Sequence, residues 1–215
     1  MPIYGHRARI GYTSPPSATE VFPYEFYKIV PDGVTLVVHT LPLVERNDEE
    51  VDRSYEASLR AAKIMARAKV DILVFGGLPI NVSKGFDNLD VLIADTEKEV
   101  GIPITTSATA QREAFKTLGC NKVGIVHPYD TSHDERHMNY MREFGLDPQG
   151  CDRAEAKFIE LGLVEEERAL KLGRSVKAQH PDIDTIYYSC PHWAMIGDID
   201  VLEKELDVTV VQPIQ

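Results

Sequence analysis

The stretch DTIYYSCPHWA, residues 184–194, holds the residues best suited to chemistry. An apolar, aromatic-rich strand pattern runs directly into Cys190. A thiol at the end of a buried strand and near a helix N-terminus can have its pKa lowered by amide dipoles or raised by apolar surroundings, so it can give or accept a proton near neutral pH. Many buried cysteines serve only as small apolar side chains. The neighbouring proline and His192, which can tune the thiol or contact a substrate, favour a catalytic Cys190.

The remaining cysteines and a histidine pair give weaker signals. Cys120 lies in a predicted helix-to-strand connection, which favours a structural role, and Cys151 lies in DPQGCDR, interpreted as a turn with an incidental surface thiol. Because no C-x-x-C spacing occurs, neither a disulfide framework nor a cysteine zinc site is predicted. His133 and His137 have the i, i+4 spacing of a zinc pair but no obvious third ligand. We interpret them as a solvated polar helix start and predict no metal.

Turns that follow predicted strands hold the candidate substrate-binding residues. Gly76 and Gly77 offer backbone N–H groups and close backbone approach, which suits an anion, although a tight turn alone also favours glycine. Ser14 and Pro15 belong to the stiff turn SPP. Tyr129, in HPY, either donates its phenol to a carboxylate or packs against its neighbours. Because ligands bind beyond the carboxyl ends of parallel strands, we expect these turns to line one cleft.

The elements that must position these residues follow from hydrophobic periodicity. Short apolar runs alternate with helical-period segments of ten or more residues, a pattern typical of βα units around parallel sheets. The expected strands cover residues 8–13, 34–40, 71–76, 102–106, 122–127, 155–160, 184–189 and 208–212. Eight such strands allow either one barrel or two smaller sheets.

An internal repeat favours the two-sheet arrangement. RIGYTSPP at 9–16 and KVGIVHPY at 122–129 are 113 positions apart, and so are DILVFGGLP at 71–79 and DTIYYSCPH at 184–192. Two separate blocks in one register indicate two similar halves. We therefore predict an α/β fold of two similar lobes, each a four-stranded, mainly parallel sheet flanked by helices. The lobes are expected to be related by a pseudo-twofold axis, with the active site between them.

The repeat also sets the predicted boundaries and one chemical asymmetry. The N-terminal lobe is expected to cover residues 1–110 and the C-terminal lobe 111–204, with the segment 205–215 packing back on the first lobe. In this register Cys190 aligns with Gly77. One lobe therefore presents a thiol, and the other presents only backbone.

Composition narrows the classes of partner. The formal net charge of −11 repels phosphate backbones and anionic lipid, so neither nucleic acid nor a membrane is an expected partner. No segment approaches the roughly 20 apolar residues of a membrane span, and the N-terminus lacks the apolar core of a signal peptide. These features predict a cytoplasmic protein. A small anionic substrate remains compatible with them, because a few N–H groups can bind a carboxylate locally.

The chain resembles the aspartate/glutamate racemase superfamily, and within it the arylmalonate decarboxylase and maleate isomerase branch. The resemblance covers nearly the whole chain and rests on four segments in order: IGYTSPP, DILVFGGLPINVSKG, GIPITTSATAQREAFKTLGCNKVGIVHPYD and YYSCPHWAMIGDIDVLEKELDVTVVQ. Racemases and isomerases of this superfamily typically carry a cysteine in each half. Here Gly77 takes the first of those positions, as in arylmalonate decarboxylase, and Cys190 matches the single cysteine of that enzyme.

The resemblance implies a cofactor-independent lyase that removes CO2 from a substituted malonate. Hydrogen-bond donors would hold the enediolate, and Cys190 would protonate it from one face. Tyr129 falls on the family's tyrosine. The sequence departs from the family at Leu78 and Pro79, where the decarboxylase has small hydroxyl residues. It departs again after the cysteine, where Pro191 and His192 replace small glycine-type residues.

Two alternative functions stay open at this stage. A racemase or cis/trans isomerase would use Cys190 with a second group such as His127 or His192. A non-catalytic carboxylate-binding protein would keep the fold without the chemistry. All three hypotheses involve a small dicarboxylate or other carboxylate, no cofactor, and a monomer or homo-oligomer.

Overall fold

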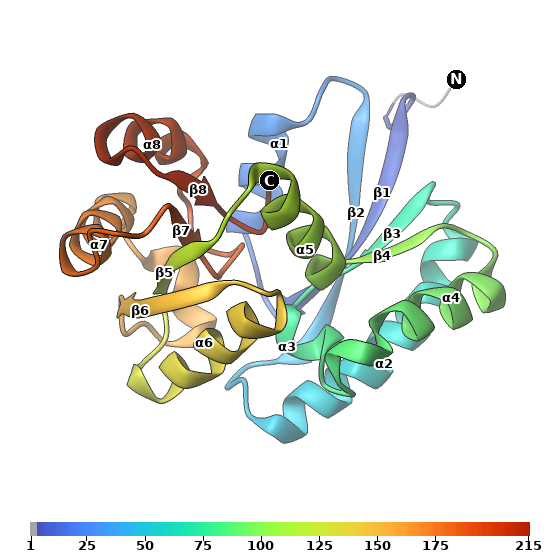
Figure 1. Cartoon of the computed structure of the whole chain (residues 1–215). Helices are drawn as coiled ribbons and strands as arrows, with labels where there is room; N and C mark the ends of the chain where they lie inside the picture. The colour runs from blue at the N-terminus through green and yellow to red at the C-terminus, as the bar shows by residue number, and fades with distance from the viewer. Residues whose placement is uncertain (1–3) are drawn as a thin grey trace. The chain divides into compact units, whose positions relative to one another are not determined.

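A computed structural model describes residues 4–215, which contain two four-stranded parallel sheets with helices against them (Figure 1). The chain forms two compact units. The first comprises the residues up to Thr19 together with Val30–Gln111, and the second comprises Glu20–Ile29 together with Arg112–Gln215. The predicted α/β class with two four-stranded parallel sheets is confirmed.

The first unit is built on a sheet of order β2-β1-β3-β4. Its elements are β1 (Ala8–Pro16), β2 (Val34–Leu43), α2 (Asp48–Arg67), β3 (Ile72–Phe75), α3 (Leu78–Asn81), η1 (Phe86–Asn88), α4 (Leu89–Val100), β4 (Ile104–Thr106) and the start of α5 (Ser107–Leu118). Helix α2 begins at the N-cap Asn47, whose side chain accepts a hydrogen bond from the Glu50 N–H. Met65 of α2 packs with Leu73 and Phe75 of β3 in the core.

The second unit repeats this arrangement with the order β6-β5-β7-β8. Its elements are α1 (Val21–Ile29), the rest of α5, β5 (Lys122–His127), η2 (Thr131–His133), α6 (Asp134–Glu143), β6 (Asp147–Arg153), η3 (Phe158–Leu163), α7 (Glu166–Gln179), β7 (Thr185–Tyr188), η4 (Ile196–Asp198), α8 (Ile199–Leu206) and β8 (Thr209–Val211).

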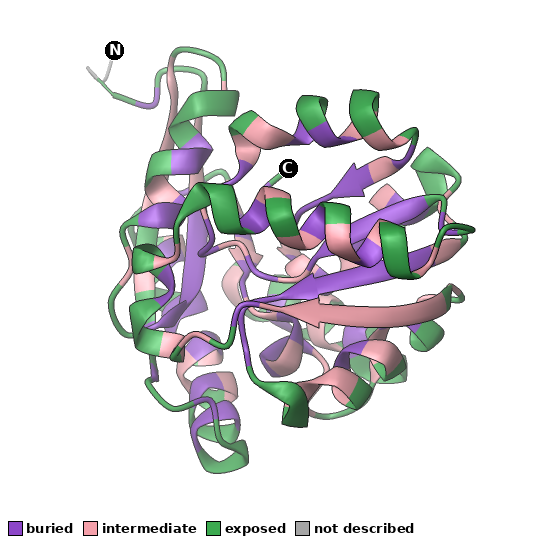
Figure 2. Cartoon of the chain, turned by 90° about the vertical axis from the view of Figure 1, so that its left-hand side faces the viewer, coloured by how far each residue is buried: buried purple, intermediate pink, exposed green. Residues whose placement is uncertain are grey.

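Alternating side chains of β5 and β7 supply both faces of this sheet. Ile125 and Tyr187 pack with Phe115 of α5 on one face. Val126 and Tyr188 belong to the cluster on the other face, with residues of α7 and α8. Buried residues accordingly concentrate on the strands, while exposed residues follow the outer sides of the helices (Figure 2). Both faces are covered, so these strands read as nearly continuous apolar runs in the sequence.

Two local expectations were wrong, and one helix was not expected. The strand expected at 155–160 is absent, because η3 occupies much of that segment and the strand lies earlier, at β6. β6 is an edge strand of half-exposed, mostly polar residues, so it carries no apolar signal. Consequently Cys151 lies within a strand and is half-buried, instead of in a surface turn. Helix α1 was not anticipated.

The C-terminal segment lies with the second unit. Residues 205–215, expected to pack back on the first lobe, carry β8, and Val210 of that strand pairs with Ile186 of β7. Strand order explains the difference, because β8 completes the second sheet as β4 completes the first. The segment Glu20–Ile29, expected in the first lobe, likewise groups with the second unit.

The helices of residues 4–215 are too short or too polar to span a membrane. The longest, α2, has 20 residues and bears charged side chains along its length. None of the helices in this part of the chain has the combined length and apolar character needed to cross a bilayer.

Candidate functional site

The thiol of Cys190 lies just past the carboxyl end of β7 and is buried. The Ser189 N–H donates to the Val126 carbonyl at 3.0 Å, which continues the β5–β7 pairing up to the residue before the cysteine. Cys190 is 1% exposed and packs with Tyr129 and Leu161. The next helix residues come only with η4 and α8, so the thiol lies in an irregular turn and not in the first turn of a helix.

Tyr129 adjoins this thiol because it follows β5, the strand next to β7. Its ring stacks on the imidazoles of His137, at 5.7 Å between centroids and 4°, and of His127, at 5.9 Å and 22°. The ring of His133 is tilted against it at 5.2 Å. The phenol ring is therefore held by aromatic contacts, and the prediction that Tyr129 and Cys190 belong to one site gains a geometric basis within this unit.

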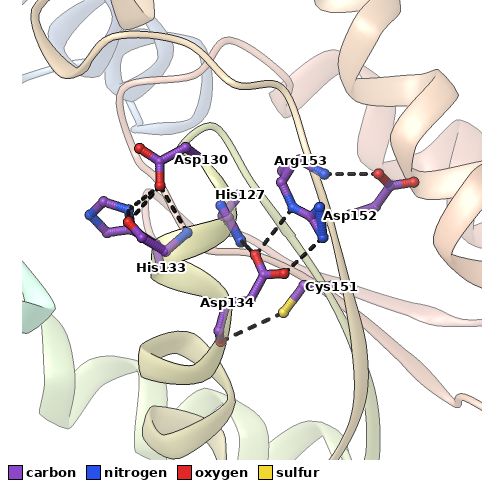
Figure 3. A network of polar contacts seen from close by, with 8 residues as sticks. His127, Asp130, His133, Asp134, Cys151, Asp152 and Arg153 are labelled. Carbon is purple, nitrogen blue, oxygen red and sulfur yellow. Dashed lines mark hydrogen bonds and ion pairs between the residues drawn. The ribbon is translucent and has the colours of Figure 1, made fainter.

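His127 is tied into an ion-pair network (Figure 3). Its Nε2 lies 2.9 Å from Asp134 Oδ1, and Arg153 donates to both oxygens of the same carboxylate, at 3.1 and 2.7 Å. The pKa of His127 is lowered to about 4, mainly by burial and also by the charge of Arg153, while Asp134 opposes both effects. The ring is therefore neutral at pH 7. Nε2 carries the proton and donates it to the carboxylate, and the buried Nδ1 has no hydrogen-bond partner among residues 4–215.

His137 differs from the expectation of a solvated pair. Its ring is 2% exposed and stacks 4.7 Å from His127, whereas His133 is half-buried in η2 with its Nδ1 3.4 Å from Asp130. The His137 ring is therefore enclosed by protein, whereas the His133 ring lies nearer to solvent. The i, i+4 spacing marks one buried ring and one near solvent, because η2 ends between them and α6 begins at Asp134.

The side chains of His127 and two of its neighbours have the donor atoms of a possible cation site. Ligand atoms of His127, Asp134 and Cys151 lie within 4.8 Å of one another. Arg153 already engages both oxygens of Asp134, and burial raises the pKa of Cys151 to about 12, so its thiol stays protonated at pH 7. A cation would have to displace Arg153. The arrangement fits an ion-pair network better than a metal centre.

His192 is buried beside the thiol turn. Its side chain is 4% exposed and its ring lies 5.9 Å from that of Phe22 in α1. Burial lowers its pKa to about 3, so this imidazole is neutral at pH 7 and a weak base. The expectation that His192 contacts substrate stays a prediction, and its surroundings are those of a core histidine.

Two polar side chains outside the predicted set fix this turn. Gln212, after β8, donates from Nε2 to the Cys190 carbonyl at 3.0 Å. Glu25 of α1 accepts from the N–H groups of Met195 and Ile196 at 3.0 and 2.7 Å. Sequence reasoning missed both residues because each acts across a long stretch of chain. The one available local signal was the acidic residue Glu25 in a mostly apolar and aromatic segment, which forms α1.

Ser189 is a third residue that the sequence analysis did not select. Its hydroxyl is buried and has no hydrogen-bond partner among the described residues. Buried hydroxyls are nearly always paired, so an unpaired one next to Cys190 suits a ligand oxygen. Its place directly before the cysteine could have identified it.

The other predicted site residues belong to the first unit, at the end of β1 and after β3. Ser14 and Pro15, expected in a turn, are part of β1, because the pairing of β1 with β2 continues to Pro16. The hydroxyl of Ser14, completely buried, has no hydrogen-bond partner within residues 4–215. The Gly76 N–H donates to the carbonyl and hydroxyl oxygens of Thr13, both at 3.1 Å, so it is not the free anion donor that was expected. Asn81 accepts from the Ser107 hydroxyl at 2.8 Å, which ties the end of α3 to the start of α5.

Gly77 has a backbone conformation that disfavours any residue with a side chain. Its φ is +85°, and a Cβ added there would lie 2.7 Å from Cγ of Pro15. A cysteine at this position would therefore be strained twice, by its backbone and by the proline. All three cysteines of the chain, Cys120, Cys151 and Cys190, lie in the second unit.

Two similar parallel α/β units in one chain define a fold class that solved structures share. A ligand-bound double variant of arylmalonate decarboxylase, glycine to cysteine and cysteine to serine, superposes with a TM-score of 0.84 at 23% sequence identity, over 96% of this chain and 87% of that one. The fold class is that of chains with two four-stranded, parallel α/β units.

The chain belongs to the arylmalonate decarboxylase family, whose profile matches residues 10–214. Arylmalonate decarboxylase of Bordetella bronchiseptica is 25% identical over 204 residues, 94% of this chain and 84% of that protein. Maleate isomerase of Alcaligenes faecalis is 28% identical over 149 residues, 66% of this chain and 58% of the isomerase. The family resemblance read from the sequence is thereby confirmed.

Proposed function

We propose that this protein is a cofactor-independent decarboxylase of a substituted malonate, with Cys190 as the proton donor. The observation that carries the proposal is the asymmetry of the two strand-end turns. The turn after β7 holds a buried thiol against Tyr129, whereas the matching turn after β3 holds Gly77 in a conformation that excludes a side chain. One thiol can protonate a carbanion but cannot by itself supply two opposed acid–base groups.

The proposed reaction needs no redox partner. The bond between the α-carbon and one carboxylate breaks, CO2 leaves, and the electron pair forms an enediolate with the remaining carboxylate. The Cys190 S–H then gives its proton to the α-carbon, and the resulting thiolate takes a proton from solvent. The apolar side chains of Leu161 and Phe158 near the thiol suit this step, because desolvation disfavours a carboxylate relative to CO2.

The enediolate also requires donors placed in advance. We infer that the hydroxyls of Tyr129 and Ser189, both in the second unit, serve this purpose. The unpaired, buried hydroxyl of Ser189 supports the inference. Substrate binding by Ser14 and by the backbone of Gly76 and Gly77 stays a prediction for the first unit, where the Gly76 N–H is already bonded to Thr13.

A cis/trans isomerase is the second candidate, favoured by the similarity to maleate isomerase. Cys190 would then add to a double bond as a thiolate and leave after rotation. A racemase is less well supported, because the proposed second bases, His127 and His192, are buried and have pKa values lowered to about 4 and about 3. Each would be a poor base at neutral pH.

The deciding experiment measures two products in parallel. Phenylmalonate, methylmalonate and maleate are incubated with the enzyme, and CO2 release and fumarate formation are recorded. We expect CO2 release from at least one malonate. Cys190→Ser should lower kcat roughly 10²- to 10⁴-fold, the usual contribution of a positioned general acid.

Cys120→Ser is the matched control and should keep wild-type turnover. Fumarate formation without CO2 release would replace the decarboxylase with the isomerase. Saturable binding of a dicarboxylate without turnover, unchanged by Cys190→Ala, would indicate a binding protein.

A further inference from the structure

The side chain of Gln212 makes a contact with the thiol residue that the proposed chemistry does not yet use. Its Nε2 donates to the Cys190 carbonyl at 3.0 Å, and its Oε1 accepts from the Ile214 N–H at 2.7 Å. Gln212 is 1% exposed. Because one end of the amide meets an acceptor and the other a donor, the orientation of the side chain is defined.

The turn that carries Cys190 is held by side chains from other parts of the chain. Between Tyr188 at the end of β7 and Ile196 at the start of η4 there is no helix or strand. The Ser189 N–H donates to the Val126 carbonyl, and Glu25 accepts from the N–H groups at the far end of the turn. Between these two anchors, Gln212 donates to the carbonyl of the cysteine itself.

Pro191 strengthens the effect that the bond from Gln212 has on the orientation of Cys190. Pro191 follows Cys190, so the backbone after the thiol residue has a fixed φ and lacks an N–H. Once the Cys190 carbonyl is held, the peptide plane between the two residues is held too, and the direction of the Cα–Cβ bond follows. Loss of this buried hydrogen bond removes a restraint on the carbonyl and lets the turn shift more easily.

We propose that Gln212 is a positioning residue for Cys190: its amide fixes the carbonyl of the cysteine and thereby aims and shields the thiol. The proposal rests on the proposed function only for the catalytic use of the thiol. The hydrogen bond from Gln212 positions the buried sulfur whether or not the thiol is catalytic. Loss of the amide should therefore change the reactivity of this one thiol even when no substrate is present.

The test is residue-resolved alkylation. Wild-type protein, Gln212→Leu and Gln212→Glu are treated with iodoacetamide, and mass spectrometry follows the labelling rates of all three cysteines. Neither substituted side chain can donate to the Cys190 carbonyl, and the glutamate keeps an acceptor for Ile214. We expect Cys190 labelling to accelerate about tenfold in both variants, because a buried thiol reacts when its turn opens.

The other two thiols are internal controls against general loosening. Cys120 and Cys151 are half-buried and should be labelled at wild-type rates. Gln215→Leu is the matched variant in the same turn: it removes the acceptor of the Gln212 N–H but leaves the Gln212 amide in place, so Cys190 should react as in wild type. Should the leucine variant fail to fold, the glutamate variant decides.

Three outcomes would overturn the proposal: unchanged Cys190 labelling, parallel acceleration of all three thiols, or an equal effect of Gln215→Leu. Turnover supplies a second readout, in which the Gln212 variants should show lower kcat at unchanged KM. If wild-type enzyme releases no CO2 from any malonate while Cys190 labelling changes as expected, the decarboxylase proposal fails and the role of Gln212 stands.

Discussion

Two buried histidines show how surroundings decide the chemistry of a residue. His127 is the last residue of β5 and His192 follows β7, and either looks suitable as an acid or base from its position in the sequence. Burial lowers the pKa of both rings far enough to keep them neutral at pH 7. They therefore support their neighbours by packing and hydrogen bonding, while Cys190 remains the proton donor that we propose.

The lowered pKa of His192 predicts a pH dependence of stability. The unfolded ring takes up a proton near pH 6.5 and the folded ring only near pH 3, so between these values the unfolded state binds more protons. The free energy of unfolding should thus fall on acidification below pH 6.5, by roughly 1.4 kcal/mol per pH unit from this group. Urea unfolding at several pH values between 7.5 and 4.5 measures the slope.

The substitution His192→Leu should make that slope shallower, because the titrating group is gone. A slope in His192→Leu as steep as in wild type would show that the buried ring is not its source.

At the level of elements, the short connections that follow β3 and β7 determine how rigidly the candidate site residues are held. The turn after β3 leads at once into α3 with Gly77 as its N-cap, while the turn after β7 stays irregular until η4. The first is therefore constrained by its own backbone. The second depends on anchors from elsewhere, Gln212 and Glu25.

The backbone of Gly77 gives a prediction about stability. Gly77→Ala should lower the free energy of unfolding by about 1–3 kcal/mol, from the positive φ and the close approach of Pro15 together. Gly101→Ala is a matched control in the same unit, with φ +72° but open space around the added Cβ, and should cost about 1 kcal/mol. Chemical denaturation followed by circular dichroism compares them. Equal costs would mean that Pro15 yields without penalty.

The molecule repeats one α/β unit twice, but the two units differ in their reactive side chains. Both sheets have the same strand order in chain sequence, with the second strand at one edge and the fourth at the other. The first unit nevertheless contains none of the three cysteines. A substrate that meets one thiol receives its proton on one face.

This asymmetry predicts the stereochemistry of the proposed reaction. A disubstituted malonate with two different substituents should yield one enantiomer in large excess, and turnover in D2O should place a single deuterium on its α-carbon. Chiral chromatography and mass spectrometry measure both. A racemic product formed at the enzymatic rate, or racemisation of the pure enantiomer by the enzyme, would contradict protonation by one thiol.

The sequence by itself determined the features that depend on local pattern. Apolar runs located seven of the eight expected strands, and the shared offset of 113 positions aligned Cys190 with Gly77. Segments resembling a known family then identified that family correctly. These inferences succeeded because side-chain periodicity and turn residues act over a few positions.

Only the tertiary structure decided what depends on distant segments meeting. Strand β6 is held by its pairing with β5 and not by apolar residues of its own. Glu25 accepts from N–H groups 170 and 171 residues away, and Gln212 donates to Cys190 from just beyond β8, the strand next to β7. Burial and unpaired hydroxyls likewise arise from packing. A hydrogen bond between remote residues leaves no periodic trace in the chain, so folding alone reveals which side chains hold the thiol.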